Sequence, residues 1–380
     1  MSDEPSLDIA VAGASDVGSI REHNEDSLLV GDLDAGAELD VADTWQASAA
    51  RGVLMVVCDG MGGVEGGEIA SDLAAKAIWR EMKATPATRD PEVFARLLRR
   101  ATRVANNDVH TMSRREIGLR GMGTTVSAAG VVGDRLVIAT VGDSRVYVLR
   151  TGAIVQVTRD QSLSSALIAA GHEAHVAEQA GSAILQALGV GDDVEPSLSI
   201  IELRRGDRVL LCSDGLHGLV GDPALAVLMG EPHTVAQAVA LLVTAARAAG
   251  GPDNITAVVA HFGGDRLAPP ASDDDLPTFR EFDPQKEGAP ALTDTSYVAR
   301  RLAARIGLPG GSSAELAIPV TGQHAIMRSR VGIRLPHTAL PIEDEDGPAR
   351  RLLAQGRSPW WLIGAIAIIA CIIAWVLGGR

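Results

Sequence analysis

The chain has 380 residues, of which 46% are hydrophobic and 22% charged, so wholesale disorder and a fibrous repeat are excluded. Its formal charge of −14 works against nonspecific binding of a phosphate backbone, and we expect no nucleic-acid partner. The three cysteines, Cys58, Cys212 and Cys371, are too few and too far apart for a disulfide framework or a structural zinc site, which indicates a reducing compartment.

Regular elements are predicted along residues 1–265. The first ten residues carry acids and no long apolar run, so we do not expect a secretory signal. Short β-branched and aliphatic runs predict strands at residues 53–58, 124–132, 135–141, 145–150, 208–212 and 255–262. Apolar residues spaced three and four apart predict helices at 67–83, 91–113 and 235–249. Gly133 and Asp134 predict a tight hairpin, and the grouping of helices favours an α+β fold on antiparallel sheet over a doubly wound parallel fold.

Four aspartates stand at the ends of these apolar strands, where a carboxylate has no stabilising reason to be. They are Asp59, Asp143, Asp214 and Asp253. One such residue is most simply a turn former, but carboxylates gathered at strand ends within one fold repel one another unless a cation neutralises them. Oxygen ligands without His or Cys select Mg²⁺ or Mn²⁺ over zinc. The sequence therefore predicts a divalent-metal centre.

A fifth segment, residues 15–26, adds an arginine to the acids. Glu25 and Asp26 enter a short apolar run, and Arg21 lies shortly before them. A guanidinium group is planar and permanently charged, so it can hold a phosphate through two parallel hydrogen bonds. A metal centre beside such an arginine predicts phosphoryl chemistry.

The charge distribution separates residues 1–265 from the segment that follows. Of the 34 basic and 48 acidic residues, 12 of each lie in residues 266–357 and Arg380 is the last, which leaves 21 basic against 36 acidic residues in 1–265. Residues 266–357 are rich in Pro and Gly and lack a sustained period, so we expect a largely disordered linker. Residues 296–306 could form a short basic helix, more simply a solvated fragment than a docking element.

Residues 360–379 contain no charged side chain and are long enough to span a hydrocarbon core of ~30 Å. We therefore expect a single transmembrane helix within residues 358–380, against the alternative of a buried helix. Three arginines precede the span and only Arg380 follows it, which by the positive-inside rule leaves the bulk of the chain in the cytoplasm. The expected location is the cell membrane, single-pass.

Seven short motifs follow one another between residues 15 and 256. They are RxxNED at 21–26, DGMGG at 59–63, GMGTT at 121–125, VGDSRVY at 141–147, TRDQS at 158–162, SDGL at 213–216 and PDNIT at 252–256. Any one is weak, but seven in this order are specific, and the segment resembles the bacterial form of the metal-dependent Ser/Thr protein phosphatases of the type-2C class. The resemblance implies a four-layer sandwich, a central antiparallel β-sandwich flanked by helix pairs, and it does not cover residues 266–380.

The resemblance also implies roles for individual residues. Asp59 would bridge two Mn²⁺ or Mg²⁺ ions, the Gly60 carbonyl would ligate one, and Asp214 and Asp253 would complete the other. Glu25 and Asp26 match an acidic pair at the metals, Asp143 with Asp214 matches a third, weaker metal site, and Arg21 would bind the substrate phosphate.

Some positions depart from the family pattern. Met61 stands where some members have a histidine proposed as the general acid, so the acid is unassigned. Gln161 replaces the family's histidine near the flap at residues 163–183, which predicts altered flap packing or substrate choice without loss of metal. The remaining histidines near the motifs are expected to be solvent-facing loop residues: His23, His172, His175 and His217. Cys58 and Cys212 are expected to be buried free thiols, with oxidative inactivation as the sharper alternative.

The leading functional hypothesis is a membrane-tethered, monomeric hydrolase that removes phosphate from Ser or Thr of proteins, with a membrane Ser/Thr kinase and its substrates as partners. One alternative is a non-catalytic anchored module that senses phosphoproteins or metal, although such a module has little physical reason to keep mutually repelling carboxylates. Another is a different two-metal phosphoesterase such as a nuclease, against which the acidic charge argues.

Overall fold

The structure, a computed structural model, describes residues 6–42, 45–48, 52–63, 65–173, 175, 183–231 and 233–283. Its elements are, in chain order, β1 (Asp8–Asp16), β2 (Asp26–Asp32), β3 (Ala37–Glu38), β4 (Trp45–Ser48), β5 (Val53–Met61), α1 (Gly66–Lys83), α2 (Pro91–Arg115), the 3₁₀ turn η1 (Ile117–Leu119), β6 (Gly123–Thr124), β7 (Val126–Val132), β8 (Arg135–Val141), β9 (Arg145–Arg150), β10 (Ala153–Gln156), α3 (Leu163–Ala169), β11 (Ser197–Glu202), β12 (Arg208–Cys212), α5 (Asp214–His217), α6 (Asp222–Met229), α7 (Val235–Ala248), β13 (Ile255–Gly263) and β14 (Phe279–Glu281).

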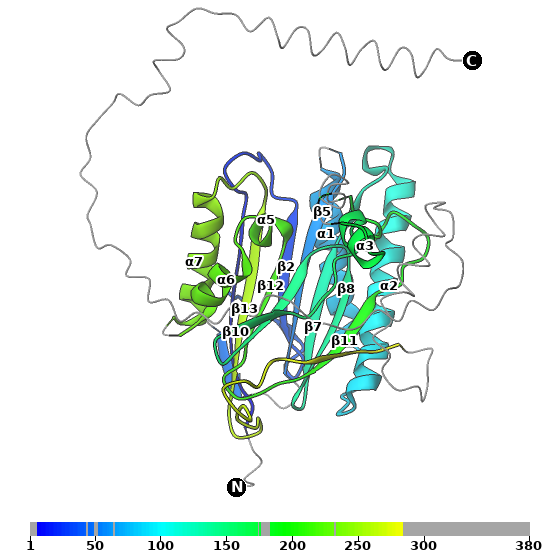
Figure 1. Ribbon diagram of the computed structural model, residues 1–380. Helices are drawn as coiled ribbons and strands as arrows, with labels where there is room; N and C mark the ends of the chain where they lie inside the picture. The colour runs from blue at the N-terminus through cyan, green and yellow to red at the C-terminus, as the bar shows by residue number, and fades with distance from the viewer. Residues whose placement is uncertain are drawn as a thin grey trace, which may run out of the picture. The chain divides into compact units, whose positions relative to one another are not determined.

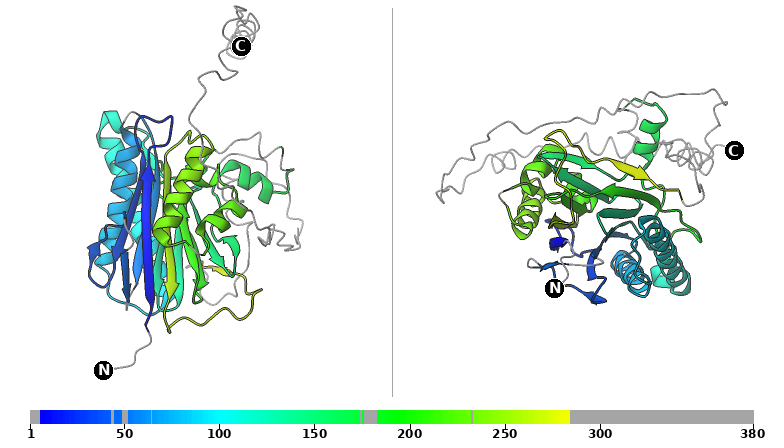
Figure 2. Two further views of the ribbon diagram at one scale, coloured as in Figure 1. Left: turned by 90° about the vertical axis from the view of Figure 1, so that its left-hand side faces the viewer. Right: turned by 90° about the horizontal axis from the view of Figure 1, so that it is seen from below.

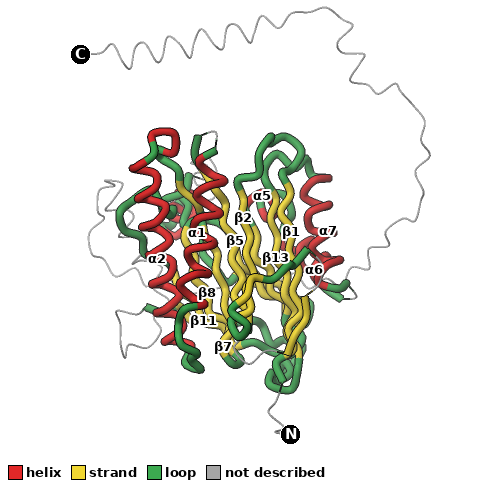
Figure 3. The backbone as a smooth tube through the Cα atoms, turned by 180° about the vertical axis from the view of Figure 1, so that it is seen from behind, coloured by secondary structure: helices red, strands yellow, loops and turns green. Residues whose placement is uncertain are grey.

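Two antiparallel sheets lie face to face, and helices cover each outer face (Figures 1 and 2). One sheet has the strand order β10-β9-β12-β13-β1-β4, and the other has the order β14-β11-β8-β7-β5-β2-β3 with β6 paired to β5. Three apolar cores separate the layers: α1 and α2 pack on the second sheet, the two sheets pack on each other, and α5, α6 and α7 pack on the first. Figure 3 shows the two helix pairs on opposite sides of the strands, so the predicted four-layer α+β sandwich is confirmed.

The predicted helices and strands form where local sequence signals and burial agree. α2 begins at an N-cap, because the Asp90 carboxylate accepts hydrogen bonds from the backbone N–H groups of Glu92 and Val93, and Pro91 needs no donor there. Thr234 and Gln237 form a capping box at the start of α7. The hairpin at Gly133 joins β7 to β8 in antiparallel register.

Residues 264–283, which we term the C-terminal strap, continue the folded unit past the predicted boundary at residue 265. Leu267 is fully buried in the core between the sheets, and the Arg266 N–H donates to the Ser6 carbonyl at 2.9 Å. β14 then pairs with β11, and Phe282 packs against the core beneath α2. The expectation of a linker beginning at residue 266 is therefore wrong for residues 266–283. Leu267 and Phe282 pack into the apolar cores, and amino-acid composition alone does not reveal such contacts.

A chain ended at residue 265 is expected to melt below a chain ended at residue 283. Burial of Leu267 and Phe282 and the β14 pairing together stabilise the fold by about 2–4 kcal/mol, which corresponds to a shift of roughly 5–10 °C for a domain of this size. Circular dichroism melts of the two chains measure this, and Leu267→Ala in the longer chain should lie between them. Identical melting temperatures would show that the strap contributes nothing.

The described residues contain no helix that is both long and apolar enough to cross a membrane. The predicted transmembrane segment at 358–380 and residues 284–357 of the predicted linker lie outside the described residues.

Candidate metal centre

The predicted site residues lie at or next to the ends of strands from both sheets. Asp26 opens β2 and Asp59 lies near the end of β5, and the two are direct partners in the β2–β5 register. In the other sheet, Asp214 follows β12 and opens α5, and Asp253 precedes β13. Asp143 lies in the turn between β8 and β9. Antiparallel order therefore places residues more than 200 positions apart at one edge.

Side chains of the first sheet hold Asp26 across the gap between the sheets. Its Oδ2 accepts hydrogen bonds from Ser213 Oγ and Thr256 Oγ1, both at 2.6 Å. Asn254 orders the neighbouring loop, because its Oδ1 accepts from the Glu25 N–H at 2.8 Å while its Nδ2 donates to two loop carbonyls. Ser213, Asn254 and Thr256 were not predicted as site residues, although they lie inside the SDGL and PDNIT motifs.

Arg21 contacts one of the predicted metal ligands. Its Nη2 donates to Asp253 Oδ2 at 2.8 Å, and its Nη1 lies 3.8 Å from Glu25 Oε2. The arginine side chain is 47% exposed, so a group entering from solvent can reach it.

Burial and like charges raise the pKa of four aspartates at this edge, Asp26, Asp59, Asp143 and Asp214. The pKa of Asp59 lies well above its usual range because of burial first, and then the charges of Asp26, Asp214, Asp143 and Asp253. Burial is also the main cause that raises the pKa of Asp26 to about 6 and that of Asp143 to about 7. The pKa of Asp214 is raised by burial and then by the charge of Asp253. The cluster thus carries more negative charge than its protein surroundings stabilise.

Within the described residues, no three His, Cys, Asp or Glu side chains are grouped so that they could hold a metal ion. Two of the acids are instead bound to protein groups, because Arg21 donates to Asp253 and the hydroxyls of Ser213 and Thr256 donate to Asp26. The donor set still fits a hard divalent cation, since all its members are oxygens and most of them are buried carboxylates.

Close backbone packing beside the acids supports that fit. The backbone of Gly67, in the first turn of α1, bonds the Glu25 carboxylate, and a Cβ at Gly67 would lie 2.3 Å from Glu25 Oε1. A Cβ at Gly60 would lie 2.1 Å from the Gly67 carbonyl oxygen. Only glycine at both positions lets β5, α1 and the Glu25 loop meet, so Gly60 lies next to the backbone of Glu25. The eight predicted residues are brought together, and their individual roles as ligands stay predictions.

Gln161 is buried beneath the Asp143 turn. Its backbone N–H donates to the Gly142 carbonyl at 2.8 Å, and its Oε1 accepts from the Gly142 N–H at 3.1 Å. Its Nε2 donates to Ser197 Oγ on β11 at 3.1 Å. The glutamine therefore supports the turn that carries Asp143 and the segment that leads into the flap.

The cysteine and histidine predictions have different outcomes. Cys58 and Cys212 are buried free thiols, as expected, and burial raises the pKa of both, which opposes thiolate chemistry. His23, His172 and His175 are exposed, as expected. The solvent-facing prediction is wrong for His217, because its ring is partly buried and Nε2 lies 3.0 Å from the Asp143 carbonyl oxygen.

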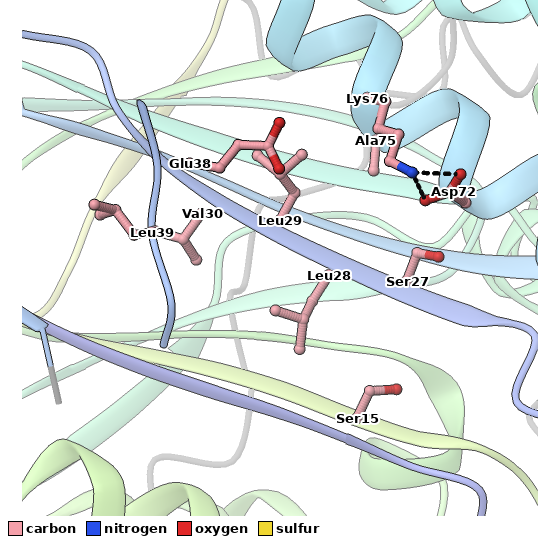
Figure 4. A pocket seen from close by; sticks show the side chains of 10 residues that line it. All are labelled: Ser15, Ser27, Leu28, Leu29, Val30, Glu38, Leu39, Asp72, Ala75 and Lys76. Carbon is pink, nitrogen blue, oxygen red and sulfur yellow. Dashed lines mark hydrogen bonds and ion pairs between the residues drawn. The ribbon is translucent and has the colours of Figure 1, made fainter. Parts of the chain in front are cut away.

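A pocket of about 340 Å³ lies beside the acidic cluster, between β1, β2 and α1 (Figure 4). Its polar lining includes Ser15, whose Oγ lies 2.7 Å from Thr256 Oγ1, and Ser27, whose Oγ lies 3.0 Å from Ser71 Oγ. At the α1 wall, Lys76 forms an ion pair with Asp72. None of the eight predicted site residues lines this pocket, so the centre is a separate feature at the sheet ends.

Comparison with known proteins yields consistent matches. The serine/threonine protein phosphatase PstP of Mycobacterium tuberculosis is 37% identical over 258 residues, 67% of this chain and 45% of that protein. The serine/threonine phosphatase stp of Listeria monocytogenes is 32% identical over 248 residues, 64% of this chain and 92% of that protein. The chain thus spans less than half of the PstP relative but most of the Listeria one.

Solved structures show the same fold. The PstP catalytic domain, in complex with two manganese ions, has a TM-score of 0.56 and 34% sequence identity over 68% of this chain and 99% of that one. Stp1 from Staphylococcus aureus has a TM-score of 0.58 and 28% identity over 66% and 94%. The sequence model described as protein phosphatase 2C matches residues 37–247, more than half of the chain. The chain therefore belongs to the protein phosphatase 2C family.

Proposed function

We propose that the chain hydrolyses phosphoserine and phosphothreonine in proteins and depends on Mn²⁺ or Mg²⁺. The observation that carries this proposal is the cluster of buried, mutually repelling aspartates beside the half-exposed Arg21. The names of the relatives and the two manganese ions in the PstP structure support it.

Asp59, Gly60, Asp214 and Asp253 would hold the two ions, with Glu25 and Asp26 beside them and Asp143 at a third, weaker site. When bound, such an ion pair lowers the pKa of a water molecule and neutralises charge that develops on the phosphoryl group.

The chain's own residues position the substrate and the acids. The Arg21 guanidinium has five N–H donors, and its contact with Asp253 leaves donors free for two phosphate oxygens. Ser213 and Thr256 hold the Asp26 carboxylate in one orientation. The thioether of Met61 has no proton to give, so the departing alkoxide takes its proton from another group.

The test is release of phosphate from a phosphothreonine peptide by the full chain with and without Mn²⁺. We expect Mn²⁺-dependent turnover, and a nucleotide and a phosphodiester should be poor substrates. Turnover no greater than that of the Asp59→Asn variant would reject the proposal. Equal turnover of the phosphodiester would favour a broader phosphoesterase.

We further propose that residues 358–380 anchor the catalytic domain at the cytoplasmic face of a membrane, where it opposes a Ser/Thr kinase. The support is the uncharged run at 360–379 with three arginines shortly before it. Membrane fractionation tests the anchor: a chain ended at residue 357 should move to the soluble fraction with unchanged activity on peptides. Retention of this shortened chain in the membrane fraction would contradict the anchor.

Phosphoproteomics of a strain lacking the gene tests whether the chain opposes a kinase at the membrane. Unchanged phosphorylation of membrane proteins would count against that role.

A further inference from the structure

His217 joins two of the loops that carry the acidic cluster. It is the last residue of the four-residue helix α5, which begins at Asp214. Residues three apart on a helix lie on the same side, so Asp214 and His217 approach the neighbouring β8–β9 turn together. His217 Nε2 lies 3.0 Å from the Asp143 carbonyl oxygen in that turn. Because a carbonyl only accepts, the imidazole carries its proton on Nε2 and donates it.

The β8–β9 turn is held rigidly on the side that faces the sheets. Gln161 bonds both polar backbone atoms of Gly142. The Ser144 carbonyl accepts from Ser127 Oγ at 2.7 Å, and Ser144 Oγ lies 2.6 Å from Thr125 Oγ1. The following residue, Arg145, forms a bidentate ion pair with Asp160, in which Nε donates to Oδ1 and Nη2 donates to Oδ2. The turn therefore has one defined position against which α5 can be fixed.

His217 supplies the contact between this turn and α5. Among the described residues, its ring is the one side chain that donates to the Asp143 carbonyl. α5 packs on the first sheet through Leu216, but its N-cap residue Ser213 makes no side-chain capping bond and instead donates to Asp26, so the hydrogen bond of His217 is what fixes the end of α5 against the turn. After burial, the charge of Asp214 does most to raise the pKa of the Asp143 carboxyl group.

We propose that His217 is a positioning residue that ties α5 to the Asp143 turn, so that Asp143 and Asp214 present their carboxylates to one divalent cation and bind it more tightly. This role deepens the proposed function, on which it rests, by assigning a residue that tunes the weakest metal site. His217 touches neither substrate nor cation in this role. It acts through the backbone of one ligand and the helix of the other.

Two amide variants of the full chain separate the positioning role from simple bulk. In His217→Gln the amide nitrogen can take the place of Nε2, whereas in His217→Asn the shorter side chain cannot reach it. Isothermal titration with Mn²⁺ alone, without substrate, should show the weakest site about tenfold weaker in His217→Asn, within the range for partners that orient metal ligands. His217→Gln should stay within about threefold of wild type, and the tighter sites should not change.

Controls establish that the effect passes through Asp143. His261 on β13 is also partly buried, and within the described residues its ring makes no hydrogen bond, so His261→Asn should leave every Mn²⁺ affinity unchanged. On an Asp143→Asn background, His217→Asn should add less than a twofold change, because the site it tunes is already lost. Circular dichroism verifies folding of each variant, and His217→Ala serves as the second short variant if His217→Asn does not fold.

Three results would overturn the proposal: equal Mn²⁺ affinities in wild type and both short variants, equal losses in His217→Gln and His217→Asn, or an undiminished effect on the Asp143→Asn background. A wild-type chain that binds only two ions also overturns it, yet leaves the proposed hydrolysis intact. Because no substrate is used, failure of peptide hydrolysis does not alter the reading of these titrations.

Discussion

Replacement of Asp59 by asparagine is expected to lower Mn²⁺-dependent phosphate release by roughly 10³-fold or more and, at the same time, to raise the melting temperature of the metal-free protein. The loss of activity follows because Asp59 lies among the other acids, with the charges of four of them acting on it. An amide oxygen is a weaker ligand for a hard cation than a carboxylate.

The gain in stability follows from the direction of the pKa shifts. Asp59 and Asp26 are buried, and their pKa values in the folded state lie above those of exposed carboxyl groups. The folded state therefore binds more protons than the unfolded state, and the stability of the metal-free protein falls as pH rises through about 4 to 6 for Asp26. At pH 7.5 that penalty is fully present. Asparagine removes one of the repelling charges and should recover about 1–3 kcal/mol.

Thermal melts in EDTA and in excess Mn²⁺ measure both halves of this prediction. Wild type should gain stability from Mn²⁺, and Asp59→Asn should gain little. Asp192→Asn is the matched control, because this carboxylate is exposed in a loop and should change neither the melt nor the turnover. A melting temperature for Asp59→Asn in EDTA below that of wild type would mean that the Asp59 carboxylate stabilises the metal-free fold. Charge repulsion among the acids would then not be the dominant effect.

The sequence indicated which acids lie at strand ends because the signals for that placement are local. Each acid lies within one residue of an apolar run, so a strand end and a carboxylate are recognised together, and antiparallel pairing then brings Asp26 opposite Asp59. The predicted helices at 67–83 and 91–113 match α1 and α2 closely for the same reason: apolar spacing marks the face, and Asp90 and Pro91 mark the start.

Features that depend on long-range pairing were missed. Nothing near His217 distinguishes a loop histidine from one that bonds a carbonyl 74 positions away. β14 has three residues and lies in a segment rich in proline, so no periodicity in the sequence reveals it. It becomes a strand by pairing with the edge of β11, which the sequence does not show. The buried ion pair between Arg150 and Asp207 was missed likewise, since a charged residue at a strand end is most simply exposed.

The largest expected effect on stability comes from that ion pair. Arg150 and Asp207 are joined by two parallel hydrogen bonds of 2.8 Å, and their side chains are 4% and 0% exposed. The same arginine also donates to the Glu202 carbonyl and faces Asp275 of the C-terminal strap. Arg150→Met leaves the buried Asp207 carboxylate with the Arg204 N–H as its one remaining hydrogen-bond donor among the described residues. It should therefore lower the free energy of unfolding by about 3–5 kcal/mol.

Urea unfolding of a double variant distinguishes an unpaired charge from lost packing. If the penalty arises from the stranded carboxylate, Arg150→Met with Asp207→Leu should recover most of the loss, because two apolar side chains of similar volume replace the pair without a buried charge. If it arises from the bonds to Glu202 and Asp275, the double variant should remain as unstable as Arg150→Met.

The control is Arg103→Met, because Arg103 and Asp193 form an ion pair at 2.6 Å but their side chains are 41% and 64% exposed. The cost of Arg103→Met should therefore stay below about 1 kcal/mol. A cost for Arg150→Met as small as that of the control would show that an unpaired Asp207 carboxylate carries no large penalty, and would contradict the prediction.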